Sequence, residues 1–183
     1  MKSIIILGST GSIGTNTLDI VQRFPDEFQV VGLTAGGNID KLEAQIRLFK
    51  PKMVAVSTEL SAATLRTRCA GLPVEILAGE DGIAQVATMP GAELVISGIV
   101  GAAGLVPTLA AIRSGKHIAL ANKEPMVMAG KLMQDEAHKH GVRIFPVDSE
   151  HSAIFQSLEG HRLEDVRRLI LTASGGALWT LTK

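Results

Sequence analysis

Short apolar runs alternate with amphipathic segments along most of the chain. The runs are rich in Val, Ile and Leu, and they predict strands at residues 4–7, 28–34, 52–56, 74–77, 94–96, 117–121, 142–147 and 166–173. Segments with helical spacing predict helices at residues 12–24, 38–50, 60–69, 82–88, 107–113, 124–140 and 152–158. Strands that alternate with helices, without hairpin turns, favour a parallel sheet covered on both faces. We therefore predict a doubly wound, Rossmann-like α/β fold.

One uncharged stretch, residues 94–112, is long enough to span a membrane. It is interrupted by Gly98, Gly101, Gly104 and Pro107, a spacing typical of a buried strand, a turn and a helix that starts near the proline. We interpret it in that second way and predict no association with membranes.

Composition narrows the possible partners. The chain has 183 residues, 46% of them apolar, enough for one core and the beginning of a second domain. Lys plus Arg and Asp plus Glu both number 18, and without a basic block we predict no nucleic-acid partner.

The apolar run after Met1 is too short for a signal peptide, so we expect no targeting segment. The single cysteine, Cys69, favours a reducing compartment, the cytoplasm or a plastid-like one.

Three glycines follow the first predicted strand directly, at positions 8, 11 and 14. Gly8 can form a tight turn, Gly11 leaves room for a pyrophosphate, and Gly14 lets the next helix pack close to the strand. The free amides at a helix start attract an anion. The pattern favours a dinucleotide site, although an ordinary strand-to-helix turn has the same glycines.

The end of the second strand bears on which dinucleotide is bound. A site for NAD places an Asp or Glu there to accept the ribose hydroxyls. Here the strand runs into Gly36, Gly37 and Asn38, with no carboxylate before Asp40. The absence of a charge that would repel a 2′-phosphate favours NADP, although no arginine is present either.

Two more loops follow strands at the edge where ligands bind in such sheets. Residues 99–104 have no polar side chain, so their glycines serve either turn geometry or close packing against a cofactor. Asn122, Lys123 and Glu124 precede Pro125, which suits the first turn of a helix. These three polar residues either face the cleft or begin a solvated helix.

Asp148 and Glu150 lie two residues apart after the strand at 142–147. On an extended chain their side chains would converge, and paired carboxylates suit Mg²⁺ or Mn²⁺. Alternatively, Asp148 or Ser149 caps a following helix, with Glu150 in its first turn. Further on, Ser174 beside two glycines predicts either an anion-binding nest or a plain turn.

Five motifs together resemble one family, the 1-deoxy-D-xylulose 5-phosphate reductoisomerases of non-mevalonate isoprenoid biosynthesis. The resemblance runs from Met1 to about Gly176, and the motifs are residues 8–14 (GSTGSIG), 99–104 (IVGAAG), 121–124 (ANKE), 148–156 (DSEHSAIFQ) and 172–176 (TASGG). It implies an NADPH-dependent and Mn²⁺- or Mg²⁺-dependent enzyme that rearranges and reduces a phosphorylated sugar to 2-C-methyl-D-erythritol 4-phosphate.

The resemblance also implies roles for individual residues. Those matching cofactor contacts are Thr10, Gly11, Ser12, Ile13, Gly36, Gly37, Asn38, Asn122 and Glu124. Those matching substrate contacts are Lys123, Ser149, Glu150 and Ser174. Asp148 and Glu150 match metal ligands, and Lys123 and Glu150 are the positions expected to be catalytic.

The sequence departs from the family at three places. Gly37 stands where many relatives carry Lys or Ser, which removes one phosphate donor, and Pro125 fixes the backbone after the Asn-Lys-Glu motif. Residues 177–183 leave the family pattern, and the later metal carboxylate, lid and phosphate clamp are missing. We therefore expect an NADPH-binding domain at 1–147 and the beginning of a catalytic domain at 148–183, from an enzyme that is a homodimer when complete.

Two other functions are compatible with parts of the sequence. One is a non-catalytic NADP-binding module or an inactive fragment of the same enzyme. The other is a short-chain dehydrogenase, which shares the glycine turn but relies on a catalytic tyrosine, and this chain has no tyrosine.

Overall fold

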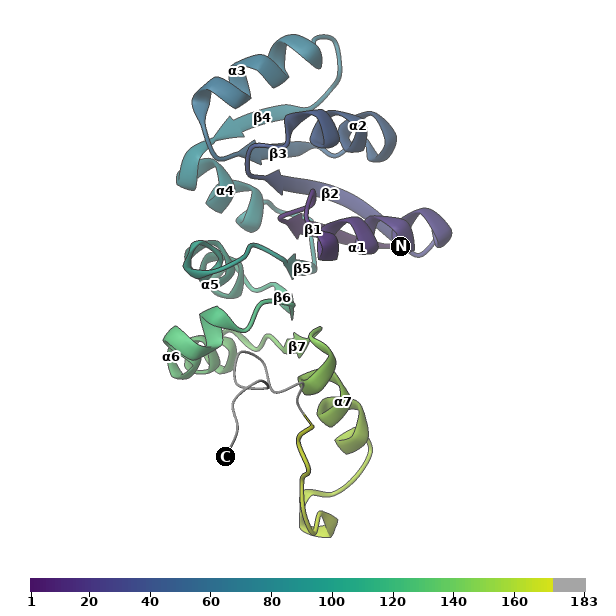
Figure 1. Ribbon diagram of the computed structural model, residues 1–183, viewed down its shortest axis with the longest axis vertical. Coiled ribbons are helices and arrows are strands. Elements are labelled where there is room, and N and C mark those ends of the chain that lie inside the picture. Colours follow the sequence, from purple (N-terminus) through teal and green to yellow (C-terminus); the bar gives the residue numbers. More distant parts are fainter. Residues whose placement is uncertain (173–183) are drawn as a thin grey trace, which may run out of the picture.

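A computed structural model describes residues 1–172, which form a seven-stranded sheet in the order β4-β3-β2-β1-β5-β6-β7 (Figure 1). The strands are β1 (Lys2–Leu7), β2 (Phe28–Ala35), β3 (Met53–Val56), β4 (Glu75–Ala78), β5 (Leu94–Ser97), β6 (His117–Leu120) and β7 (Ile144–Pro146). All neighbouring strands are parallel. The carboxyl ends of the strands therefore meet at one edge of the sheet, and the loops after them lie side by side.

Helices cover both faces of this sheet, as the sequence predicts (Figure 1). They are α1 (Ser12–Arg23), α2 (Ile39–Phe49), α3 (Glu59–Arg68), α4 (Gly79–Thr88), α5 (Leu105–Arg113), α6 (Glu124–His140) and α7 (Ser149–Leu158), with short 3-10 turns η1 (Ala102–Gly104) and η2 (Leu163–Asp165). One face is covered by α1, α2 and α3, and the other by α4, α5 and α6.

The central strand β1 divides its side chains between two cores. Ile4 and Ile6 belong to the core under α1, α2 and α3, whereas Ile5 and Leu7 belong to the core under α4, α5 and α6. None of the four is more than 2% exposed. Burying such a side chain contributes about 1.5–3 kcal/mol relative to leaving it in water. The strand that leads into the glycine turn is therefore fixed from both faces.

The uncharged stretch 94–112 forms β5, η1 and most of α5, which confirms the interpretation as strand, turn and helix. Within residues 1–172, no helix is long and apolar enough to cross a membrane.

The strand predicted at 166–173 is wrong for residues 166–172, which follow η2 without regular structure. Leu169, Ile170 and Leu171 are 57%, 71% and 59% exposed. A β-strand is stable only beside a hydrogen-bonding neighbour, and the sheet of the described residues ends at β7. Residue 173 lies outside the described part of the chain.

Strand order also locates the cleft. The chain leaves β1 toward β2 on one side, and β5 joins β1 on the other. In such sheets a ligand binds where the order reverses, beyond the carboxyl ends of the two central strands. The loops after β1 and β5 border this point.

Candidate functional site

The glycine turn after β1 requires glycine at two of its three positions. Gly8 has φ +81°, and a Cβ there would lie 2.8 Å from the carbonyl oxygen of Gly98 in the loop after β5. A Cβ on Gly14 would lie 2.4 Å from Cα of Ser9. By contrast, a Cβ on Gly11 would meet only the Gly8 oxygen, at an ordinary 3.4 Å. Local packing thus explains why residues 8 and 14 are glycines, but it does not require a glycine at position 11.

Buried hydrogen bonds from β2 and α2 hold this turn. The N–H of Gly8 donates to Oγ1 of Thr34 (3.0 Å), and the N–H of Ser9 donates to the Thr34 carbonyl (2.8 Å). The Ser9 hydroxyl donates to Oε1 of Gln45 (2.7 Å), whose Nε2 donates back to the Ser9 carbonyl (2.9 Å). Ser9, Thr34 and Gln45 are all buried. The backbone of the turn is therefore fixed before any ligand binds.

Helix α1 starts at the end of this turn without a capping side chain. Gly11 is its N-cap, and no acidic residue lies in the first turn. The first amides of a helix have no partner within the helix and carry partial positive charge. Thr10 and Ile13 are half-buried, and Gly11 and Ser12 are exposed. These four predicted cofactor contacts thus lie together at a helix start that suits an anion.

The loop after β2 is open. Neither Gly36 nor Gly37 has positive φ, and a Cβ at either would have no neighbour within 4 Å. Oδ1 of Asn38 accepts from the N–H of Lys41 (3.1 Å) and caps α2. Asp40, the first carboxylate after the strand, pairs with Arg68 of α3. Its charge is therefore compensated, which keeps the end of β2 compatible with a phosphate.

Turn geometry accounts for the glycines of the loop at 99–104. Gly101 has φ +74°, and a Cβ on Gly104 would lie 2.9 Å from the Ile99 oxygen. Behind the loop, the Thr108 hydroxyl donates to the Gly104 carbonyl (2.6 Å) and is 2.8 Å from Oγ of Ser97. Of the two alternatives left by the sequence, the structure supplies direct evidence for the turn.

The polar residues after β6 lie where the sequence predicts, at the start of α6. Pro125 is in the first turn, and Glu124 begins the helix. Asn122 is different from its neighbours, because its Nδ2 is buried and has no hydrogen-bond partner among the described residues. A buried donor without a partner costs about 1–3 kcal/mol, so this position suits a ligand acceptor.

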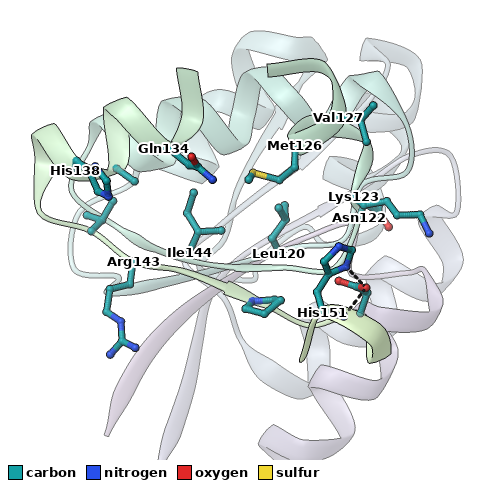
Figure 2. Close-up of a pocket in the computed structure, with 14 residues that line it drawn as sticks. Leu120, Asn122, Lys123, Met126, Val127, Gln134, His138, Arg143, Ile144 and His151 are labelled. Atoms are coloured by element: carbon teal, nitrogen blue, oxygen red, sulfur yellow. Dashed lines mark hydrogen bonds and ion pairs between the residues drawn. The ribbon is translucent and has the colours of Figure 1, made fainter. Parts of the chain in front are cut away.

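A cavity of about 800 Å³ lies between α6 and the strands β6 and β7 (Figure 2). Its apolar lining includes Leu120, Met126 and Ile144. Its polar lining includes Asn122, Lys123, Asp148 and His151. Residues after two neighbouring strands thus meet at one end of the cavity, although they are about 25 positions apart in sequence.

Asp148 caps α7. Its Oδ2 accepts from the N–H of His151 (3.3 Å) and lies 2.5 Å from Nδ1 of the same histidine. Burial alone would raise the pKa of Asp148, but the hydrogen bonds from the ring and backbone of His151 outweigh it and lower the pKa. Both contacts use Oδ2, so Oδ1 makes no hydrogen bond to the described residues.

Glu150 lies in the first turn of α7, where Oε2 accepts from the Ser149 hydroxyl (2.8 Å). This hydrogen bond is the main cause of a lowered pKa for Glu150, which the Lys123 charge lowers further and the Asp148 charge opposes. Lys123, Asp148 and Glu150 are therefore close enough to interact electrostatically. Phe155 packs on Phe145 of β7 with ring centroids 6.1 Å apart, which attaches α7 to the sheet.

Of the predictions for Asp148 and Glu150, one is wrong and one remains a prediction. Convergence of Asp148 and Glu150 on an extended chain is wrong, because α7 begins at Ser149, three residues earlier than predicted, and places Glu150 on a helix. Among residues 1–172, no three His, Cys, Asp or Glu side chains gather around a point that could hold a metal. The metal role of the two carboxylates stays a prediction, and Ser174 lies outside the described residues.

Sequence reasoning missed three residues that hold the glycine turn. They are Thr34, Gln45 and Lys41, and Nζ of Lys41 donates to the Thr10 carbonyl (3.0 Å). Gln45 had a detectable signal, since it lies on the apolar side of α2 between Leu42 and Ile46. A polar residue on a buried helix face has to find a partner. Thr34 and Lys41 had no such signal, because their partners are distant in sequence.

Comparison with known proteins gives a consistent result. The family model for 1-deoxy-D-xylulose 5-phosphate reductoisomerase matches residues 4–130, and the model for the C-terminal domain of the same enzyme matches residues 144–183. The prediction that residues 177–183 leave the family pattern is therefore wrong. The reductoisomerase of Geotalea uraniireducens is 58% identical over 180 residues, which are 98% of this chain and 47% of that protein. The chain spans about half the length of the curated relatives it matches.

Solved structures agree. The reductoisomerase from Zymomonas mobilis in complex with NADPH is 44% identical, with a TM-score of 0.92 over 99% of this chain and 48% of that one. A second, a reductoisomerase in complex with NADPH, fosmidomycin and magnesium, is also 44% identical, with a TM-score of 0.82 over 85% of this chain and 38% of that one.

Proposed function

The chain belongs to the 1-deoxy-D-xylulose 5-phosphate reductoisomerase family, and we propose that it forms the NADPH-binding part and the beginning of the catalytic part of such an enzyme. The reaction is the rearrangement of 1-deoxy-D-xylulose 5-phosphate and its reduction to 2-C-methyl-D-erythritol 4-phosphate. It serves isoprenoid biosynthesis in the cytoplasm, and the complete enzyme acts as a homodimer. The division into residues 1–147 and 148–183 is part of this proposal.

The observation that carries the proposal is the uncapped start of α1 at the rigid glycine turn. Its side chains offer no negative charge and no cap, so a pyrophosphate supplies what the helix start lacks. In this proposal Thr10, Gly11, Ser12 and Ile13 surround the pyrophosphate. Such a site is formed almost entirely by backbone groups.

The other cofactor contacts fit NADPH by the same physical test. The open space beside Gly36 and Gly37, next to the Asn38 cap, leaves room for the adenosine phosphate. At the other end, the unpaired Nδ2 of Asn122 is a donor that needs an acceptor, and Glu124 lies one helix position beyond Lys123. NADPH, which is bound in two of the related structures, has oxygen acceptors that could bind the Asn122 donor.

At the α7 end, Asp148 and Glu150 offer carboxylate oxygens, which are the ligands that Mg²⁺ and Mn²⁺ prefer. When bound, the ion supplies Lewis acidity at the substrate carbonyl, and NADPH supplies the hydride. Lys123 and Ser149 bind the substrate beside the two carboxylates, and Ser174 binds near its phosphate. The pKa of Asp148 is lowered by hydrogen bonds from His151 and that of Glu150 by the hydrogen bond from Ser149, and the charge of Lys123 adds to both effects.

A charge placed at the helix start tests the cofactor proposal. Ser12→Glu adds a carboxylate to the first turn of α1, where it should stabilise the fold by about 0.3–1 kcal/mol. The same charge should weaken NADPH binding by about 10-fold or more through repulsion of the pyrophosphate. Asn16→Glu, on the next turn and also exposed, is the control. NADPH fluorescence and thermal unfolding give both readouts.

Opposite signs in the two measurements would support a pyrophosphate at this helix start. Unchanged NADPH affinity in Ser12→Glu would contradict it, and absence of NADPH binding by the unmodified chain would favour a domain without a cofactor.

The carboxylate proposal needs a variant that keeps the helix cap. Asparagine caps helices as well as aspartate does, so Asp148→Asn removes the charge and preserves α7. In the complete enzyme, Mn²⁺-dependent turnover should fall on the order of 100-fold or more, with NADPH affinity unchanged. Retained turnover would leave Asp148 with the role of a cap only. A cofactor-binding module without catalysis would show no turnover in either form.

A further inference from the structure

Lys41 reaches across the edge of the sheet from the first turn of α2 to the glycine turn. Its Nζ donates to the carbonyl of Thr10 (3.0 Å) and to Oγ1 of Thr15 on α1 (2.8 Å). Its own N–H is bound by Asn38, the cap of α2. The ammonium is therefore held against the glycine turn by two hydrogen bonds, on a helix that begins directly after the loop at 36–38.

This positive charge has no carboxylate partner among residues 1–172. The two acidic residues nearest to it on α2 are already paired, Asp40 with Arg68 and Glu43 with Arg47 at 2.8 Å. The start of α1, where Thr15 lies, adds the positive end of a helix. A charged amine at such a place is stabilised when an anion binds there.

Within the described part of the chain, the hydrogen bonds of the Lys41 amine use two of its three N–H donors. A lysine ammonium has three N–H groups, and two of them are directed at Thr10 and Thr15. Gly36 and Gly37, which precede α2 by a few residues, are exposed and leave open space at the end of β2, where the ribose of a bound dinucleotide lies in this fold. The remaining N–H and the full charge are available to an anion in that space.

We propose that Lys41 binds the 2′-phosphate of NADPH and makes this chain prefer NADPH to NADH. The proposal rests on the NADPH-binding function proposed above and adds the group that discriminates between the two cofactors. The pairing of Asp40 with Arg68 of α3 favours the same preference, because the charge of the first carboxylate after β2 is compensated and repels a 2′-phosphate less.

Lys41 also links α2 to the glycine turn, so its loss has two separable effects. A purely structural link would affect NADPH and NADH equally, since both carry the pyrophosphate. A contact to the 2′-phosphate affects NADPH alone. The ratio of the two dissociation constants therefore tests the proposal, whatever happens to the turn.

The experiment measures binding of NADPH and of NADH to the unmodified chain, to Lys41→Met and to Lys52→Met. Lys52 is exposed and lies just before β3, at the opposite edge of the sheet, so it controls for the loss of one charge. We expect Lys41→Met to weaken NADPH by about 10- to 100-fold, as for a charge-assisted hydrogen bond, and NADH by less than about 3-fold. Lys52→Met should change neither.

A second variant restores a charge from another position. Gly37→Lys places an ammonium beside the same space without a steric clash. Added to Lys41→Met, it should recover most of the lost NADPH affinity and restore the ratio of NADPH affinity to NADH affinity. Equal weakening of both cofactors by Lys41→Met, or no recovery with Gly37→Lys, would overturn the role of Lys41. If the unmodified chain binds neither cofactor, the NADPH-binding function itself fails and the inference falls with it.

Discussion

The glycine-turn corner (residues 8–14 with Thr34 and Gln45) and the α7 edge (residues 144–158) lie at the same side of one sheet but are held in different ways. In the corner, β1 is buried on both faces, and the turn makes five hydrogen bonds to β2 and α2. At the α7 edge, no residue of α7 is buried, and the attachment depends on Phe155 against Phe145. One region is rigid by itself, whereas the other has few contacts of its own.

The difference indicates how the two ends of the site are organised. A pyrophosphate is the same in every dinucleotide, and a fixed backbone binds it without rearrangement. In the proposed function, the substrate and metal contacts at the α7 edge lie on an element that has no buried residue and therefore few interactions to stabilise it. Elements of this kind are the ones that move or fold upon binding.

The largest effect is expected in the corner. Gly14→Ala places a Cβ 2.4 Å from Cα of Ser9 and 2.5 Å from the Gly8 oxygen, both of them backbone atoms. Neither atom can move without breaking the turn. We therefore expect the free energy of unfolding to fall by about 3 kcal/mol, and we expect NADPH binding to be lost. Urea unfolding measures the loss of stability, and a titration with NADPH measures the loss of binding. The control is Gly130→Ala on α6, where a Cβ would lie 3.7 Å from its nearest neighbour and should change neither. A stable Gly14→Ala that binds NADPH would mean that the corner is not rigid.

A smaller and local effect is expected at the α7 edge. Phe155→Ala removes an edge-to-face contact worth about 1 kcal/mol. We expect faster hydrogen exchange in α7, with global unfolding and NADPH binding unchanged, because the corner does not depend on this helix. Gln156→Ala, exposed on the same helix, is the control. A shift in the midpoint of global unfolding would show that the two regions are coupled.

The smallest effect is expected at low pH, where Asp148 becomes protonated and its cap on α7 weakens. Hydrogen bonds from His151 outweigh burial and lower the pKa of Asp148, so its cap is more stable when ionised. Its stabilising contribution is complete above the unfolded pKa of about 3.9 and is lost as the pH falls through the lower folded value. We expect α7 amides to lose protection from exchange in that range before the corner does. Asp148→Asn should abolish this difference, whereas its persistence would assign it to another group.

The sequence predicts the fold well because its signals are local. Apolar runs and helical spacing depend on neighbouring residues, and the glycines at 8 and 14 have the tight contacts expected of them. The support of the turn was not predictable, because Thr34 and Gln45 meet Ser9 only after the sheet has formed. The strand predicted at 166–173 is wrong over residues 166–172 for the opposite reason. Its residues have strand propensity, but a strand depends on a neighbour that no local pattern contains.

The strand order has a consequence for synthesis on the ribosome. β1 emerges first but occupies the middle of the sheet, and its second edge stays unpaired until β5, at residues 94–97, has been made. The Leu7 carbonyl, at the entrance to the glycine turn, receives its hydrogen bond from the N–H of Gly98 (2.9 Å). We expect a nascent chain to become able to bind NADPH only once this residue has left the exit tunnel, so early intermediates expose a central strand edge that chaperones can recognise.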